Sequence, residues 1–254
     1  ECLRKYFVMW ECYHVNNYEY DFAQPGFELS PASLVPTNIR PIAFSVLSDE
    51  FVNGLAANDF EVTPATATVV NIAQTTAGRA WNVSVNFVDP NPIAIVENVG
   101  LTLKEGAVTD LAGNTNVRIV FPTRRFDTII PTFASLGGSV SGTYNTNAII
   151  SIDITFSEKV FVTGTPQLQL NTAPLRRANY VGGSGDTSLQ FSYTVQSGDV
   201  NNGTFLDYTS ATALLLSGGT IRDEAGNNAN LTLPAPGSGS SLTSVRSIVV
   251  DGTP

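Results

Sequence analysis

The segment Ile150-Ser-Ile-Asp-Ile-Thr-Phe156 alternates large apolar side chains with polar ones along its whole length. Successive side chains of a β-strand point to opposite faces, so this spacing gives one apolar and one polar face. Trp81–Phe87 and Leu189–Val195 show the same period of two, and no comparable helical stripe appears in the chain. Strands of this kind, separated by turns rich in Gly, Asn, Asp and Pro, predict an all-β protein whose sheets pack in pairs.

Composition supports a secreted β-protein and excludes some kinds of partner. The chain has 254 residues, enough for two domains of ~100–150 residues each. Charged residues make up 14%, against ~25% in an average soluble protein, so Ser, Thr, Asn and Gln supply most of the polar surface. The net charge is -9 and no basic stripe is visible, which disfavours nucleic-acid binding. The acidic groups either keep the protein soluble or bind divalent cations.

An internal repeat divides the sequence. The motif Asp-x-Ala-Gly-Asn occurs at Asp110–Asn114 and again at Asp223–Asn227, and Val46–Val52 resembles Ile154–Val160 without a gap. Each half ends on a similar exit, at 126–131 and at 250–254. We therefore predict domains at 31–127 and 128–254, after an N-terminal segment 1–30. The short linker around Asp127 contains Pro and should join the domains stiffly, and the second exit implies a further unit.

These residues resemble the bacterial-type Ig-like repeats of large extracellular adhesins and surface filament proteins. The resemblance is carried by Thr155-Phe-Ser-Glu158 with Val160, by Gly164–Leu170, by Asp223–Asn227 and by Asp127–Thr132. It covers nearly all of the second half, and the first half more loosely. It implies two tandem immunoglobulin-like β-sandwich domains in a structural or adhesive protein. It implies no ligand, because one fold hosts many functions.

Calcium is the sharpest hypothesis for chemistry. If the second strand of the second domain ends at Glu158, and the Asp223–Asn227 turn leads into its last strand, both lie at the pole where Asp127 arrives. Calcium takes ~6–8 oxygen ligands and suits carboxylates and an Asn carbonyl. The predicted ligands are Asp127, Glu158, Asp223 and Asn227 in the second domain and Glu50, Asp110 and Asn114 in the first, with Asp251 serving a following unit. The alternative is that Asp and Asn only stabilise turns, by bonding nearby backbone amides.

Catalysis is not expected. The single histidine, His14, lies in the aromatic N-terminal segment and cannot readily supply a catalytic triad or a His-rich metal site. Two cysteines cannot make an all-cysteine zinc site, and no glycine-rich stretch has the Lys and the strand-to-helix context of a phosphate loop. Cys2 and Cys12 either close a disulfide, as an oxidising compartment favours, or stay unpaired.

The sequence allows more than one role for the N-terminal segment, and it contains three possible glycosylation sites. The aromatic segment is either the end of a preceding domain or an arm that packs on another subunit, for example by strand addition. Glycosylation sequons occur at Asn82, Asn202 and Asn230. Asn82 follows the apolar Trp81 in a strand and should point outward, where it can carry a glycan.

The function expected from the sequence is a non-enzymatic repeat unit of an extracellular adhesin, stalk or surface filament. Its partners would be neighbouring copies or repeats, or a surface glycan or receptor. The alternatives are a glycan- or receptor-binding module and an accessory domain of a secreted enzyme. No apolar run approaches the ~18 residues that a membrane-spanning helix requires.

Overall fold

The computed structural model describes residues 21–88, 95–201 and 204–253. With 50% strand and 5% helix in several antiparallel sheets, it confirms the predicted all-β class. Within these ranges, no helix has the length and apolar character needed to cross a membrane. Cys2, Cys12 and Asn202 lie outside the described residues.

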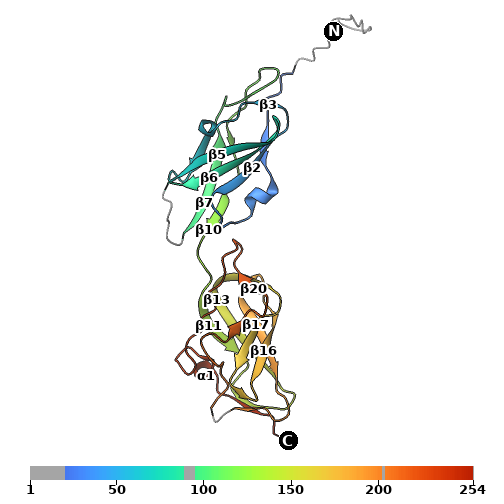
Figure 1. Ribbon diagram of the computed structural model, residues 1–254, viewed down its shortest axis with the longest axis vertical. Helices are drawn as coiled ribbons and strands as arrows, with labels where there is room; N and C mark the ends of the chain where they lie inside the picture. Colours follow the sequence, from blue (N-terminus) through green and yellow to red (C-terminus); the bar gives the residue numbers. More distant parts are fainter. Residues whose placement is uncertain (1–20, 89–94, 202–203, 254) are drawn as a thin grey trace, which may run out of the picture. The chain divides into compact units, whose positions relative to one another are not determined.

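The chain divides into two compact units, shown in Figure 1. Unit 1 comprises the described residues of Glu1–Val35, Ile39–Asn91 and Glu97–Arg125. Unit 2 comprises those of Pro36–Asn38, Pro92–Val96 and Phe126–Pro254. Each unit is described by itself below.

Unit 1 is built on a four-stranded antiparallel sheet in the order β1-β2-β6-β5, with bounds Phe27–Leu29, Ile42–Ser48, Ala80–Phe87 and Ala67–Thr76. A second sheet has the order β10-β7-β4, with β9 also pairing with β7. Its bounds are Arg124–Asp127, Val96–Leu103, Phe60–Thr63 and Ile119–Val120. The last residues of β10, Phe126 and Asp127, and the first residue of β7, Val96, already belong to unit 2. Two short strands, β3 (Val52–Asn53) and β8 (Thr109–Asp110), pair with each other, and two short 3-10 helices cover Pro31–Leu34 and Ala57–Asp59.

Unit 2 has a larger sheet in the order β11-β13-β17-β16-β14-β19, with β20 pairing with β13. The bounds are Phe133–Gly138, Ile149–Thr163, Asp186–Thr194, Arg176–Gly182, Gln167–Leu170, Leu214–Leu215 and Thr220–Arg222. A smaller sheet has the order β12-β21-β18-β15, with bounds Gly142–Asn145, Ile248–Asp251, Val200–Asn201 and Thr172–Ala173. The pairing of β12 with β21 is parallel. One short helix, α1, covers Leu242–Val245.

The two units share the register of their central strands. Phe44 of β2 pairs with Val83 of β6, and Ile152 of β13 pairs with Phe191 of β17. Phe44 lies as many positions before Ile152 as Val83 lies before Phe191. The sequence repeat is therefore also a repeat of strand pairing. A slip of one residue in either unit would have turned the apolar side chains of the strand to the opposite face of the sheet.

The alternation in the sequence corresponds to alternation in burial. Trp81 is buried whereas Asn82 is exposed, and Ile152 is buried between the exposed Ser151 and the half-buried Asp153. In unit 2 the buried apolar residues form one continuous core that includes Phe191. Full burial of an aliphatic or aromatic side chain of this size contributes about 1.5–3 kcal/mol, so these alternating strands supply most of the driving force for folding.

One expectation about strand ends is wrong. The strand that was expected to end at Glu158 continues to Thr163 as β13. Its pairing with β17 is interrupted between Thr155 and Val160, and its last residues pair with β20 instead. A bulge bends a strand and increases its twist, which allows β13 to leave one partner for another while Glu158 stays inside the strand.

Candidate metal centre

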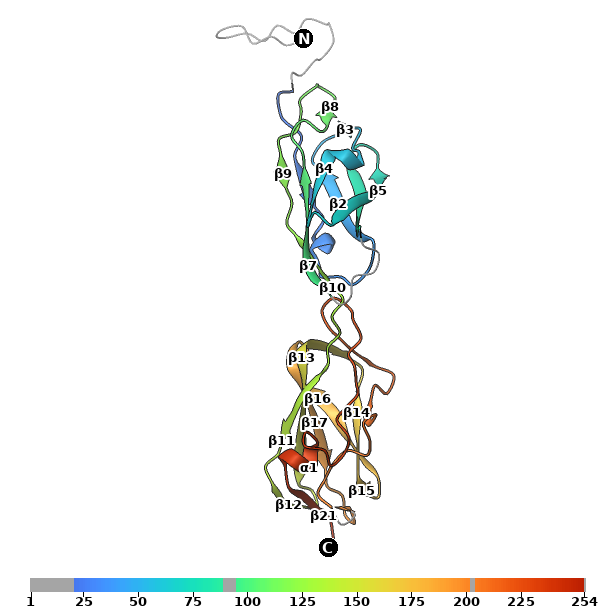
Figure 2. The same ribbon diagram turned by 90° about the vertical axis from the view of Figure 1, so that its left-hand side faces the viewer.

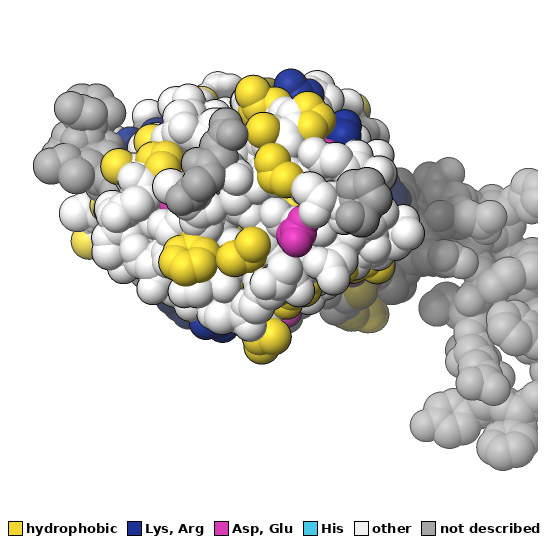
Figure 3. All heavy atoms as spheres, turned by 90° about the horizontal axis from the view of Figure 1, so that it is seen from below, with side chains coloured by type: hydrophobic (Ala, Val, Ile, Leu, Met, Phe, Trp, Pro, Cys, Tyr) yellow, Lys and Arg dark blue, Asp and Glu magenta, His cyan; other side chains and the backbone are white. Residues whose placement is uncertain are grey.

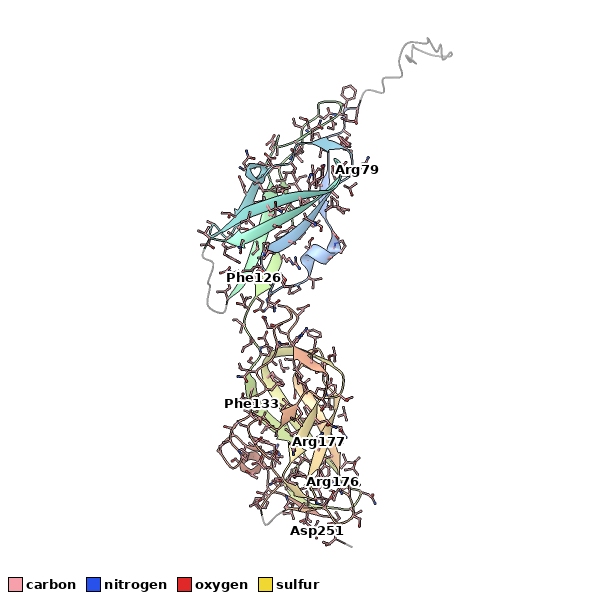
Figure 4. All side chains as sticks on the ribbon, in the orientation of Figure 1. Arg79, Phe126, Phe133, Arg176, Arg177 and Asp251 are labelled. Atoms are coloured by element: carbon pink, nitrogen blue, oxygen red, sulfur yellow. The ribbon has the colours of Figure 1, made fainter. Side chains whose placement is uncertain are left out.

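Three carboxylates of unit 2 meet where its chain begins. Asp127 is the last residue of β10, Glu158 lies in the irregular part of β13, and Asp223 follows β20 directly. One carboxylate oxygen from each lies within 4.8 Å of the others. Asp127 and Asp223 are buried, and Glu158 is half-buried. In Figure 4, Phe126 and Phe133 mark the stretch of chain that contains Asp127.

Asn227 organises this cluster. Its backbone N–H donates to Asp223 Oδ1 at 2.7 Å, and its Nδ2 donates to Asp223 Oδ2 at 2.7 Å. The same Nδ2 also donates to the carbonyl of Asp127 at 2.9 Å. Its side-chain oxygen accepts a hydrogen bond from Asn38 Nδ2 at 2.9 Å. Asn227 therefore orients the Asp223 carboxylate and ties it to the Asp127 backbone, whereas the sequence predicted its oxygen as a ligand.

Unit 1 repeats this arrangement. The backbone N–H of Asn114 donates to Asp110 Oδ1 at 2.8 Å, and its Nδ2 donates to Asp110 Oδ2 at 2.7 Å. The Asn114 Nδ2 also donates to a backbone carbonyl, that of Asp21, at 3.0 Å. Asp21, Glu50 and Asp110 again bring one carboxylate oxygen each within 4.8 Å of one another. The structure thus brings Glu50 and Asp110 together as predicted, with Asn114 beside them.

Sequence reasoning missed Asp21, although a signal was present. Asp21 precedes Pro25 by the same spacing with which Asp127 precedes Pro131. Both aspartates make the same local turn, because the N–H of the residue two positions later donates to the carboxylate, at 2.9 Å in each case. The Asp-x-x-x-Pro pattern therefore marks the start of each unit.

Asp251, expected to serve a following unit, makes a related turn. The N–H of Thr253 donates to Asp251 Oδ1 at 3.2 Å, and hydrogen bonds from Thr253 lower the pKa of the Asp251 carboxyl. Figure 4 labels Asp251 at the end of unit 2. Figure 3 views unit 2 from that side, where scattered apolar side chains lie among mostly uncharged ones.

The electrostatics of unit 1 show the mutual repulsion within its cluster. Burial raises the pKa of the Glu50 carboxyl, and the nearby charges of Asp110, Asp21 and Asp49 raise it further, against a smaller opposing effect of Arg79. For Asp110, burial alone would raise the pKa, but hydrogen bonds from Asn114 and from backbone amides outweigh burial and lower it. Asp110 is therefore held ionised while Glu50 ionises less readily, which is the response expected of a carboxylate near others.

Both Asp-x-Ala-Gly-Asn turns need glycine. Gly113 and Gly226 each have φ of 94°, a region that residues with a Cβ rarely adopt. We expect Gly226→Ala to lower the free energy of unfolding by about 1–2 kcal/mol, because alanine is strained at this positive φ. Steric clash should add nothing, since the new Cβ would meet only Asn38, at an ordinary contact distance of 3.8 Å. Chemical denaturation would measure this loss, with Gly239→Ala as the control at an open position without a positive φ. Equal stability of the two variants would contradict the prediction.

The sequons that the structure describes are accessible. Asn82 is exposed on β6, where its Oδ1 accepts a hydrogen bond from Ser45 Oγ at 2.9 Å. Asn230 is exposed, and the N–H of Thr232 donates to its Oδ1 at 3.0 Å. Glycosylation at Asn82 and Asn230 stays a prediction.

A further hollow in unit 2 was not predicted. It has a volume of about 870 Å³ and is lined by Asn171, Phe205 and Asp207, among others. Asp207 is buried, and its Oδ2 accepts hydrogen bonds from the N–H of Gly237 at 3.0 Å and from Thr243 Oγ1 at 2.9 Å. The carboxylate is therefore used to hold neighbouring loops together.

Comparison with known proteins adds no relative on which to base a function. The chain matches no family model, no curated protein and no solved structure. The functional argument therefore depends on the chain's own residues.

Proposed function

We propose that this chain is a non-enzymatic structural or adhesive segment of a long extracellular surface protein or filament, built from two immunoglobulin-like β-sandwich units. The observation that carries the proposal is the repetition of strand register and of the acidic turn in both units. A protein whose role is to provide length and stiffness is built from repeated units, each with a fixed site where it begins. Its partners in this role are neighbouring copies or repeats, and a surface glycan or receptor.

Calcium is the cofactor that the acidic clusters suit. Two oxygen ligands of one calcium ion, each ~2.4 Å from it, lie at most about 4.8 Å apart, and the three carboxylates of each cluster meet this limit. Asp127, Glu158 and Asp223 would hold the ion in unit 2, and Asp21, Glu50 and Asp110 in unit 1. Asn227 and Asn114 would orient the ligands.

A bound ion would act on stability in two ways. It would remove the repulsion between carboxylates that otherwise lie close together at low dielectric. It would also hold Asp127, through which the chain passes into unit 2, against Glu158 and Asp223 of that unit. The leading segment of the unit would then be ordered, and the linker would lose freedom.

Calcium should therefore stabilise the native chain against unfolding. At a calcium concentration 100 times the dissociation constant, each site should add about 2.7 kcal/mol to the free energy of unfolding. Thermal unfolding in calcium and in a chelator, with calorimetric titration of the metal, would measure this. Glu158→Gln should remove most of the effect of unit 2, whereas the control Glu224→Gln, at an exposed position next to Asp223, should retain it. An unchanged melting temperature in calcium and chelator would reject the calcium part of the proposal.

A further inference from the structure

The strand β5 leaves one edge of the sheet of unit 1 open. It is the terminal strand in the order β1-β2-β6-β5, and its ladder runs with β6 from the pair Ala67–Phe87 to the pair Thr76–Ala80. Among the residues that the structure describes, no strand pairs with its other edge. Figure 2 shows β5 at the margin of unit 1. The backbone groups along that edge therefore make no ladder hydrogen bonds within the described residues and are available to an extended chain, although the short helix at Ala57–Asp59 and β4 lie near β5.

Unit 2 shows what occupies the corresponding edge. Ile72 of β5 pairs with Val83, and at the equivalent register Tyr180 of β16 pairs with Phe191. The outer edge of β16 is taken by β14, which pairs with it antiparallel from Gln167 to Leu170. The matching strand of unit 1, β4, pairs with β7 instead. The occupant that fits the open edge is therefore an antiparallel strand.

The composition of β5 favours pairing with itself. Its sequence from Ala67 to Thr76 has ten residues with no charged side chain and no proline. Natural edge strands are usually protected by Lys, Pro, short length or β-bulges. β5 has ten residues without Lys or Pro, and its register shifts, between Val69 and Asn71 and between Gln74 and Thr76, leave a regular stretch from Asn71 to Gln74. In an antiparallel pair of identical strands, a charge would lie near its own copy and repel it. Because the chain has a net charge of -9, an uncharged edge is a part of it that a second copy can approach without repulsion.

We propose that β5 pairs antiparallel with β5 of a second copy across a two-fold axis. This pairing would join the β1-β2-β6-β5 sheet of one copy to the same sheet of the other. Symmetric self-pairing of this kind uses the same surface on both partners, and main-chain hydrogen bonds supply the affinity. This inference rests on the proposed function, in which neighbouring copies are partners, and it identifies β5 as their lateral contact. Its test needs no calcium, so the two proposals can fail separately.

Sedimentation of the native chain in reducing buffer, over protein concentrations up to about 1 mM, would test the pairing. Reduction excludes dimers linked through Cys2 or Cys12. We expect a monomer–dimer equilibrium, weakened roughly tenfold by Val70→Lys or Ala73→Lys because each substitution occurs twice in the pair. Val181→Lys, at a similarly exposed valine on β16, the strand whose edge pairs with β14, should leave association unchanged. Far-ultraviolet circular dichroism would show that all variants are folded.

Hydrogen exchange gives a second readout that a folding defect would not imitate. Amides of β5 should gain protection as protein concentration rises, whereas those of β16 should not change. A chain that stays monomeric, or a loss of association equal in Val70→Lys and Val181→Lys, would overturn the proposal. So would loss of association in Trp10→Ser with no loss in Val70→Lys, because the N-terminal segment would then be the contact.

Discussion

Replacing Asp199 with alanine is expected to lower the free energy of unfolding of unit 2 by about 3–5 kcal/mol, the cost of breaking a buried ion pair. Asp199 is fully buried. Its Oδ1 accepts a hydrogen bond from Arg176 Nε at 2.8 Å, and its Oδ2 accepts one from the Tyr193 hydroxyl at 2.6 Å and one from the N–H of Gln196 at 2.8 Å. Truncation would leave a buried phenol and part of a guanidinium without an acceptor.

Chemical denaturation of the native chain and the variant would measure this loss. The matched control is Asp186→Ala, because Asp186 is exposed and its carboxylate accepts a hydrogen bond from the N–H of Thr187 at 2.8 Å. We expect the control to change stability by less than about 0.5 kcal/mol. If Asp199→Ala changed stability no more than Asp186→Ala, the buried network would not stabilise this unit.

The same network predicts a dependence on pH. Burial alone would raise the pKa of the Asp199 carboxyl, but hydrogen bonds from Tyr193, Gln196 and Arg176 outweigh it and lower the pKa below its ordinary value. A lowered pKa in the folded state stabilises the protein above the ordinary Asp pKa, and this stabilisation is lost as pH falls through the folded-state value. Burial also raises the pKa of Tyr193, so its hydroxyl keeps its proton and remains a donor. Asp199→Asn should therefore unfold with less dependence on pH in the acid range than the native chain.

Phe191→Ala should have an effect of similar size, about 3–5 kcal/mol, because truncation of a buried Phe leaves a cavity. Phe191 is fully buried in β17 at the centre of the unit 2 core. It pairs with Ile152 across the sheet, and its ring contacts that of Tyr180 edge-on, with centroids 6.0 Å apart. Removal of the ring would therefore disturb both neighbouring strands.

The control for this prediction is Phe161→Ala. Phe161 lies near the end of β13 and is 41% exposed, so its truncation should cost much less. Denaturant midpoints of the two variants, at unchanged denaturant slope, would give the comparison. Similar losses in the two variants would mean that the alternating faces do not form the core described above.

Much of the local structure could be predicted from the sequence alone. The apolar positions of Trp81–Phe87 and Leu189–Val195 indicated which side chains would be buried, because the two faces of a strand differ only by parity. The repeated Asp-x-Ala-Gly-Asn motif likewise indicated equivalent turns, since Asp and Asn bond nearby amides and glycine adopts positive φ. The immunoglobulin-like topology, the metal and the role in an extracellular filament stay proposals.

Other features depended on contacts between distant parts of the chain. The missed ligand candidate, Asp21, lies far in sequence from Asp110, and only folding brings its carboxylate into the cluster. The continuation of β13 past Glu158 depends on pairing with β20, which lies much later in the sequence of unit 2. The open edge of β5 and the covered edge of β16 follow from where β4 and β14 pair, although the central registers of the two units agree.

The sequence by itself determined which side chains of each strand are buried and where the acidic turn of each unit lies. Both depend on the alternation of side chains along a strand and on the chemistry of a few adjacent residues. Only the tertiary structure decided which carboxylates meet, which amide orients them and which strand edge remains unpaired. These depend on contacts between segments that are remote along the chain, and no local pattern specifies which remote partner a strand end or a side chain will find.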